Sequence, residues 1–119
     1  MRRTYLRFTS LSTCVWSGVA KAWVDRNGNG IEEANETPLS GVTFVLWYEG
    51  RRFSLTSGPT GEAHFLLRIP CEHKAVLEIH AEPMEGYQLT TSQSIENIPV
   101  SILPEEPFLF GFVESNHDP

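Results

Sequence analysis

Turn-forming residues are spread along the whole chain and divide it into short segments. Nine glycines and eight prolines occur among the 119 residues, and the apolar stretches between them are rich in β-branched and aromatic residues, which favour strands. Residues 41–48 are the clearest example, and no segment shows the periodicity of an amphipathic helix. Short strands separated by regular turn signals are typical of a β-sandwich. We therefore predict an all-β sandwich of about seven strands.

The individual strands can be placed from their composition and from the turns that bound them. Turns are expected at Glu49-Gly50 and Glu85-Gly86, and a bulge is expected at Gly18. The last apolar segment is expected to pair beside the first. The predicted strands cover residues 15–24, 41–48, 52–56, 63–69, 75–81 and 107–113.

A chain of this length fits one domain, because roughly two-thirds of its unfolded surface can be buried in a single core. We assign residues 15–113 to that domain, residues 1–14 to a leader or disordered N-terminus, and residues 114–119 to a frayed tail.

Charge and composition exclude several classes of function. Fifteen acidic residues against nine basic ones leave a net charge of −6, which repels a phosphate backbone, so we expect no nucleic acid partner. No apolar run approaches the roughly 18 to 20 residues that span a bilayer, so we expect no transmembrane segment. No nucleophile motif such as Gly-x-Ser-x-Gly is present, and we expect a protein without enzymatic activity.

The chain contains two cysteines, Cys14 and Cys71. They suit one disulfide in an oxidising compartment or two unrelated thiols in a reducing one, and the sequence leaves both open. We take the disulfide as a hypothesis. A further alternative treats Cys14 as a lipid anchor, because the preceding Leu11-Ser12-Thr13 loosely resembles a bacterial lipoprotein cleavage box.

The chemistry of the chain is concentrated in residues 25–36. This stretch satisfies every fixed position of a twelve-residue calcium loop: oxygen-bearing side chains at positions one, three, five, nine and twelve, and glycine at position six. Calcium takes six to eight oxygen ligands, and alternate residues direct theirs toward one centre. The isoleucine at position seven is expected to offer its carbonyl and to pack its side chain inward. The predicted ligands are Asp25, Asn27, Asn29, Ile31, Glu33 and Glu36.

The alternative for this stretch is a polar hairpin turn, since Asn27-Gly28 and Asn29-Gly30 both suit type I′ turns. A plain turn explains the glycines but gives no reason for acids at the first and twelfth positions together. The flanking segments indicate strands rather than the helices of an EF-hand. We therefore predict that calcium joins two strands and has a structural role. Because a weak calcium site fills where the ion is abundant, this favours an extracellular or cell-surface location.

Several motifs around the loop resemble one known family. Trp23-Val24-Asp25, Asn27 to Ile31, Glu36 and Pro38 to Val42 are similar to the calcium-binding B domains of serine-aspartate-repeat surface adhesins. The resemblance extends to about residues 15–113 through Gly61 to Phe65, Glu82-Pro83, Gly86-Tyr87 and Phe110-Gly111-Phe112.

The resemblance implies a prealbumin-like sandwich, broadly immunoglobulin-like and related to the B-type repeats of collagen adhesins. It implies the same six calcium ligands and a secreted or surface-attached structural or adhesion module, whose partner would be a host or matrix protein or a glycan. Related domains often carry an internal isopeptide bond, for which Lys21, Asn116 and Glu78 are the candidates here.

The main rival function is carbohydrate binding. Aromatic side chains stack on sugar rings, and four of them stand in or beside the predicted strands, although aromatic residues in strands more often belong to the core. The four candidates for a stacking platform are Trp16, Trp23, Trp47 and Tyr48.

Overall fold

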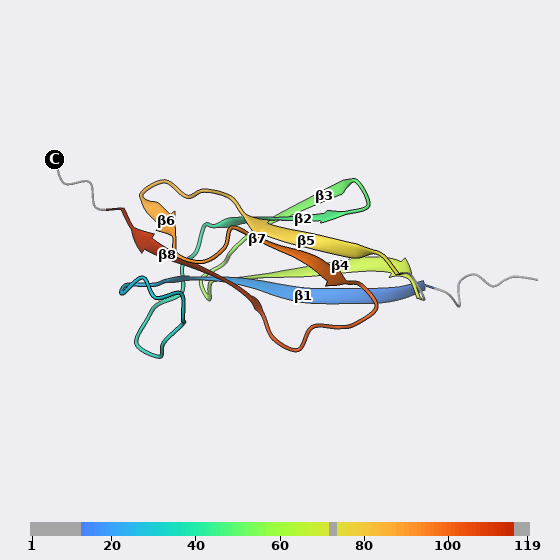
Figure 1. Cartoon of the computed structure of the whole chain (residues 1–119), viewed down its shortest axis with the longest axis horizontal. Helices are drawn as coiled ribbons and strands as arrows, with labels where there is room; N and C mark the ends of the chain where they lie inside the picture. The colour runs from blue at the N-terminus through green and yellow to red at the C-terminus, as the bar shows by residue number, and fades with distance from the viewer. Residues whose placement is uncertain (1–12, 72–73, 116–119) are drawn as a thin grey trace, which may run out of the picture.

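The computed structural model describes residues 13–71 and 74–115 and shows two β-sheets packed face to face (Figure 1). Strands and turns account for the regular structure of these residues, and none of them is helical. The predicted all-β sandwich is thus confirmed, with eight strands in the described part rather than about seven. They are β1 Thr13–Val24, β2 Thr43–Tyr48, β3 Arg51–Thr56, β4 Glu62–Pro70, β5 Val76–Ala81, β6 Tyr87–Leu89, β7 Ser94–Pro99 and β8 Phe108–Glu114.

Each sheet has four strands, and β1 is central to the first of them. The strand order is β4-β1-β8-β6 in one sheet and β3-β2-β5-β7 in the other. β1 runs antiparallel to β4 and parallel to β8, with Ala20 opposite Phe108 and Val24 opposite Phe112. The prediction that the last strand pairs beside the first is therefore confirmed.

The core forms where alternating side chains of the two sheets meet. In β4, Ala63, Phe65, Leu67 and Ile69 are buried while the residues between them face outward, which is the period of two expected of a half-buried strand. The rings of Phe44 and Phe110 come from opposite sheets and their centroids lie 5.4 Å apart. Pairs of this kind stabilise a core beyond the area they bury.

The sequence did not predict β6 and β7. β6 has only three residues and follows the turn at Gly86, whose φ is +87°. β7 is a largely polar edge strand with one buried side chain, Ile98, and its pairing with β5 shifts register between Leu77 and Ile79. Neither strand shows the apolar alternation by which a strand is recognised in a sequence.

The bulge expected at Gly18 is wrong, because β1 and β4 pair in continuous register from Thr13 to Lys21. Glycine is needed there for space: a Cβ atom would lie 2.6 Å from the Trp16 ring. The turn at Glu49-Gly50 is confirmed, with φ of 50° and 76° at the two residues, as a type I′ turn requires.

A disulfide joins Cys14 to Cys71, whose Cα atoms lie 4.8 Å apart, so the disulfide hypothesis is confirmed. The lipid-anchor alternative for Cys14 is wrong, because its sulfur is already bonded. Intramolecular disulfides are typical of extracellular proteins. The described residues contain no helix that could cross a membrane. Of the residues assigned to a leader, 1–14, and to a frayed tail, 114–119, the structure places Thr13 and Cys14 in β1 and Glu114 in β8. Residues 1–12 and 116–119 lie outside the described residues.

Candidate metal centre

The loop 25–36 leaves the end of β1 and returns beside it. Val24 N donates to Thr37 O at 2.8 Å, and Leu39 N donates to Ala22 O at 3.0 Å. An isolated β-bridge between Trp23 and Pro38 lies between these two bonds. Position one and position twelve of the loop are therefore held close together by the backbone, through residues 37–39, which precede the next strand, β2.

Asp25 occupies the first position and is fully buried, with 0% of its surface exposed. Its backbone N donates to Phe112 O in β8 at 2.6 Å. Its Oδ2 accepts two hydrogen bonds, from Gly30 N at 2.7 Å and from Thr90 Oγ1 at 2.6 Å. Burial by itself raises the pKa of this carboxyl, but the hydrogen bonds it accepts, first among them that from Thr90, outweigh burial and leave the pKa below its ordinary value.

The second oxygen of Asp25, Oδ1, is buried and has no hydrogen-bond partner among residues 13–71 and 74–115. Buried polar atoms in folded proteins are nearly always paired, and a buried charged group without a partner is costly. An oxygen in this state, on a carboxylate whose low pKa keeps it ionised, is suited to receive a cation.

Glu36 at the twelfth position faces the same end of β1. Its Oε1 accepts hydrogen bonds from Trp23 Nε1 at 2.9 Å and from Glu33 N at 3.1 Å, and its Oε2 accepts one from Arg26 N at 3.1 Å. The side chain is half-buried. The loop backbone thus folds around this carboxylate, which draws the beginning and the end of the loop together.

The side chains at positions three, five and nine contact one another at the exposed side of the loop. Asn27 Nδ2 donates to Glu33 Oε1 at 2.9 Å, and Asn29 Nδ2 donates to Glu33 Oε2 at 3.4 Å. The two amide oxygens accept from the backbone N of Asn29 and of Ile31, at 3.3 and 3.0 Å. A carbonyl oxygen has two lone pairs, so each keeps one that could bind an ion.

The orientation of the Ile31 side chain differs from the prediction. Its side chain is 62% exposed, so the prediction that it packs inward is wrong. Gly30, with φ of +77°, makes the turn as predicted, and this turn directs Gly30 N toward Asp25 and leaves the following side chain in solvent.

The acidic side chains do not form a metal site by themselves. Within residues 13–71 and 74–115, no three His, Cys, Asp or Glu side chains come together closely enough to hold a metal ion. The donors that fit calcium are a mixed set of carboxylate and amide oxygens, which matches the oxygen preference of the ion. The unpaired Oδ1 of Asp25 is the observation that supports this fit.

Sequence reasoning missed two residues of this cluster, Trp23 and Thr90. Trp23 lies two residues before the first position of the loop, and its place in the motif Trp23-Val24-Asp25 is a signal that could have identified it. Thr90 is 65 residues from Asp25 in the sequence, and no local pattern connects the two.

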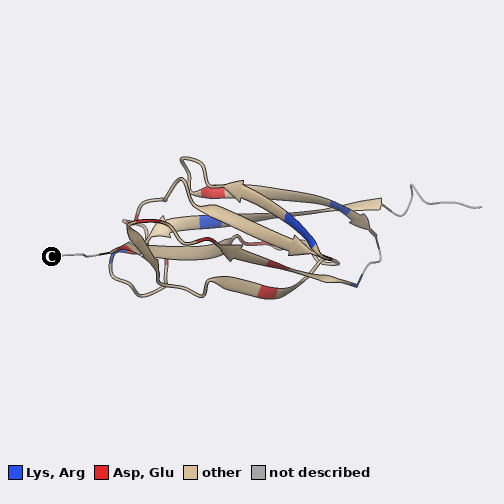
Figure 2. Cartoon of the chain, turned by 90° about the horizontal axis from the view of Figure 1, so that it is seen from above, with Lys and Arg blue, Asp and Glu red and all other residues tan. Residues whose placement is uncertain are grey.

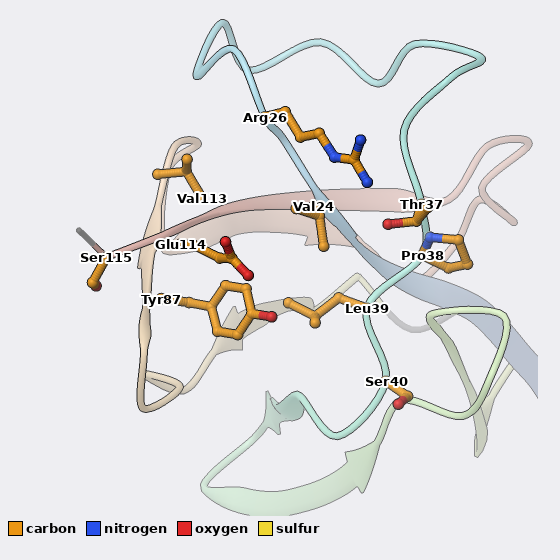
Figure 3. A pocket seen from close by; sticks show the side chains of 10 residues that line it. All are labelled: Val24, Arg26, Thr37, Pro38, Leu39, Ser40, Tyr87, Val113, Glu114 and Ser115. Atoms are coloured by element: carbon orange, nitrogen blue, oxygen red, sulfur yellow. The ribbon is translucent and has the colours of Figure 1, made fainter. Parts of the chain in front are cut away.

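A pocket of about 740 Å³ lies beside the loop (Figure 3). Its lining includes Arg26, Thr37, Tyr87 and Glu114. Opposite charges on its walls give no preference for anions or cations. Ser40 and Ser115 also line it, and none of the histidines within residues 13–71 and 74–115 does.

The four aromatic residues considered for sugar binding do not form a platform. Trp16, Trp23 and Tyr48 are buried in the core, and Trp47 alone of the four reaches the surface, with 38% exposed. Sugar stacking requires exposed ring faces, which three of these residues lack.

Of the three candidates for an isopeptide bond, the structure describes Lys21 and Glu78, which belong to different sheets. Lys21 Nζ forms an ion pair with Glu32 Oε2 at 2.8 Å. Glu78 belongs to β5 in the other sheet, and Asn116 lies outside the described residues. In the described part of the chain the basic residues are scattered and form no continuous stripe along the ribbon, and Arg51 and Arg52 are adjacent in sequence (Figure 2).

Comparison with known protein families finds no family that matches this sequence, and comparison with curated proteins finds no similar one.

Proposed function

We propose that this chain is a calcium-stabilised β-sandwich module of an extracellular or cell-surface protein, with a structural or adhesion role and no enzymatic activity. The observation that carries the proposal is the buried, unpaired Oδ1 of Asp25 at the first position of a twelve-residue loop with oxygen donors at the calcium-binding positions. A divalent cation at this point would give the buried charge its partner.

Calcium is the ion we propose because all the available donors are oxygens. Asp25, Glu33 and Glu36 supply carboxylates, and Asn27 and Asn29 supply amide oxygens. Calcium accepts such sets at six to eight ligands with flexible geometry, whereas magnesium requires a compact octahedron and loses water reluctantly. The sixth predicted ligand is the carbonyl of Ile31, so no side chain is needed at that position.

The surrounding structure supports an extracellular setting. The Cys14–Cys71 disulfide is stable in an oxidising compartment, where calcium is also abundant enough to fill a weak site. The motifs shared with the B domains of serine-aspartate-repeat adhesins point in the same direction. We propose that the sandwich is of their prealbumin-like type and that its partner is a host or matrix protein or a glycan.

The proposal is tested by calcium titration calorimetry and by thermal unfolding with calcium or with chelator. With free calcium a hundredfold above Kd, binding to the native state stabilises the fold by about 2.7 kcal/mol, or about 10 °C in Tm for a domain of this size. Magnesium should give a much smaller shift.

Glu32 and Glu33 are adjacent in the sequence, and substitution of Glu32 is the matched control for substitution of the predicted ligand Glu33. Glu33→Gln and Glu36→Gln should weaken or abolish the calcium-dependent shift, because both remove a ligand charge. Glu32→Gln removes the same charge from a residue outside the ligand set and should retain the shift. Absence of calcium binding at millimolar ion, together with identical melting curves in calcium and chelator, would overturn the proposal.

A further inference from the structure

Two side chains outside the twelve-residue loop hydrogen-bond to its first and last carboxylates. Thr90 Oγ1 donates to Asp25 Oδ2 at 2.6 Å, and Trp23 Nε1 donates to Glu36 Oε1 at 2.9 Å. Trp23 belongs to β1, and Thr90 follows β6. Strands β1 and β6 belong to the same sheet as β8, so the two carboxylates are oriented from the body of the sandwich and not by the loop alone.

Thr90 is itself held in place by β8. Its backbone N donates to Gly111 O at 2.8 Å, and Gly111 N donates to Thr91 Oγ1 at 3.2 Å. A Cβ atom at Gly111 would lie 2.5 Å from Thr90 Oγ1 and 2.9 Å from the Trp23 ring. The glycine therefore makes room for Thr90 and Trp23 to pack against the same point of β8.

The hydrogen bonds of Asp25 determine which of its oxygens is available. Oδ2 already accepts from Gly30 N and from Thr90 Oγ1, which occupies both of its lone pairs. A carboxylate is planar, so holding Oδ2 also sets the direction of Oδ1. Oδ1 is the oxygen that is buried and unpaired.

We propose that Thr90 and Trp23 are positioning residues of the calcium site: Thr90 turns Asp25 so that it binds the ion through Oδ1 alone, and Trp23 holds Glu36 in place to close the loop. This inference rests on the proposed calcium binding. The calcium site would then include residues distant in sequence, because its affinity would depend in part on Thr90, which is 65 positions away from Asp25.

Calcium titration of the full chain with its disulfide intact, using CaCl₂, tests the role of Thr90. Thr90→Val keeps the shape of the side chain and removes the donor, and loss of such an outer hydrogen bond weakens metal binding by about 10- to 100-fold. Thr90→Ser restores the hydroxyl and should restore the affinity. Thr56→Val is the matched control, because Thr56 is an exposed residue at the end of β3 in the other sheet. It should leave Kd unchanged.

The role of Trp23 can be tested by NMR on the unmodified protein, so that no variant is needed that could fail to fold. The indole N–H proton resonance of Trp23 should shift on addition of calcium, because its acceptor Oε1 belongs to the Glu36 carboxylate, whose other oxygen, Oε2, accepts one hydrogen bond and keeps a lone pair for the ion. That of Trp47, which lies in the other sheet and is partly exposed, should not shift.

The outcomes separate this inference from the proposed function. If the unmodified chain binds no calcium, the proposed function itself is wrong. If it binds calcium while Thr90→Val keeps the same Kd, or while the Trp23 resonance stays in place, the positioning role is wrong and the calcium site stands. A weakened Thr90→Val variant, rescue by Thr90→Ser and a shifted Trp23 resonance together support the inference.

Discussion

The two ends of β1 are anchored in different ways. Close to its start, Cys14 is joined to Cys71 by a covalent bond that needs no further partner. Directly after its end, Asp25 is held by hydrogen bonds and has one buried oxygen with no hydrogen-bond partner among the described residues. The first anchor is completed by the chain itself, whereas under the proposed function the second is completed by a calcium ion. In that proposal, one strand combines a permanent anchor with one that depends on an ion.

The two anchors also act on different states of the chain. A disulfide stabilises mainly by restricting the unfolded state, in the chain-entropy account. A metal ion that binds only the assembled loop stabilises the native state. Reductant and chelator should therefore weaken opposite ends of the same strand, and the following changes test whether they do.

The largest effect is expected from removal of the disulfide. Cys14 and Cys71 are 57 residues apart in the sequence, and a loop of that length corresponds to about 4 kcal/mol in the chain-entropy account. The double variant Cys14→Ser/Cys71→Ser should lose about this much free energy of unfolding, measured by urea denaturation in chelator. Its calcium affinity should stay the same while it remains folded. A large loss of affinity in the folded variant would show that the two ends of β1 are not independent.

A smaller loss is expected when the support behind the carboxylates is overpacked. Gly111→Ala introduces a Cβ atom 2.5 Å from Thr90 Oγ1, and overpacking of this kind costs about 1–3 kcal/mol. Thermal unfolding in chelator measures the loss, and calcium titration should show weaker binding as well. Gly58→Ala is the control, because a Cβ atom there meets no other atom within 4 Å. Equal stability of the two variants would contradict the packing described at β8.

The smallest effect is expected at the ion pair that ties the middle of the loop to β1. Lys21 Nζ and Glu32 Oε2 are 2.8 Å apart, and their side chains are 24% and 28% exposed. Pairs this accessible to water contribute about 0–1 kcal/mol and are screened by salt. A double-mutant cycle of Lys21→Gln and Glu32→Gln should give a coupling energy in that range that falls as salt is raised. A coupling of several kcal/mol would place this pair among the main anchors of the loop.

Features that depend on neighbouring residues were predictable. The Glu49-Gly50 turn follows from residue types that tolerate positive φ, and the alternation of β4 follows from the period of a strand. The acidic and amide residues of the loop are also ordered by local spacing. The errors arose where a neighbour in space decided the outcome: Gly18 is required by the Trp16 ring and not by a bulge, and the Ile31 side chain faces solvent.

Features that depend on distant contacts were decided by the tertiary structure alone. The sequence left open whether Cys14 and Cys71 form a disulfide or remain two unrelated thiols. The packing of the sandwich brings their Cα atoms to 4.8 Å, and the two residues form a disulfide. The strands β6 and β7 form because edges of existing sheets are there to pair with, not because their own residues favour strands.

The loop shows the same division most clearly. The sequence by itself determined which residue types stand at positions one to twelve, because that order is a property of the chain. Only the tertiary structure decided that Asp25 is buried, that Thr90 occupies one of its oxygens, and that the other has no partner. Burial and hydrogen bonding between residues 65 positions apart exist only after the strands have packed, so no local pattern could have revealed them.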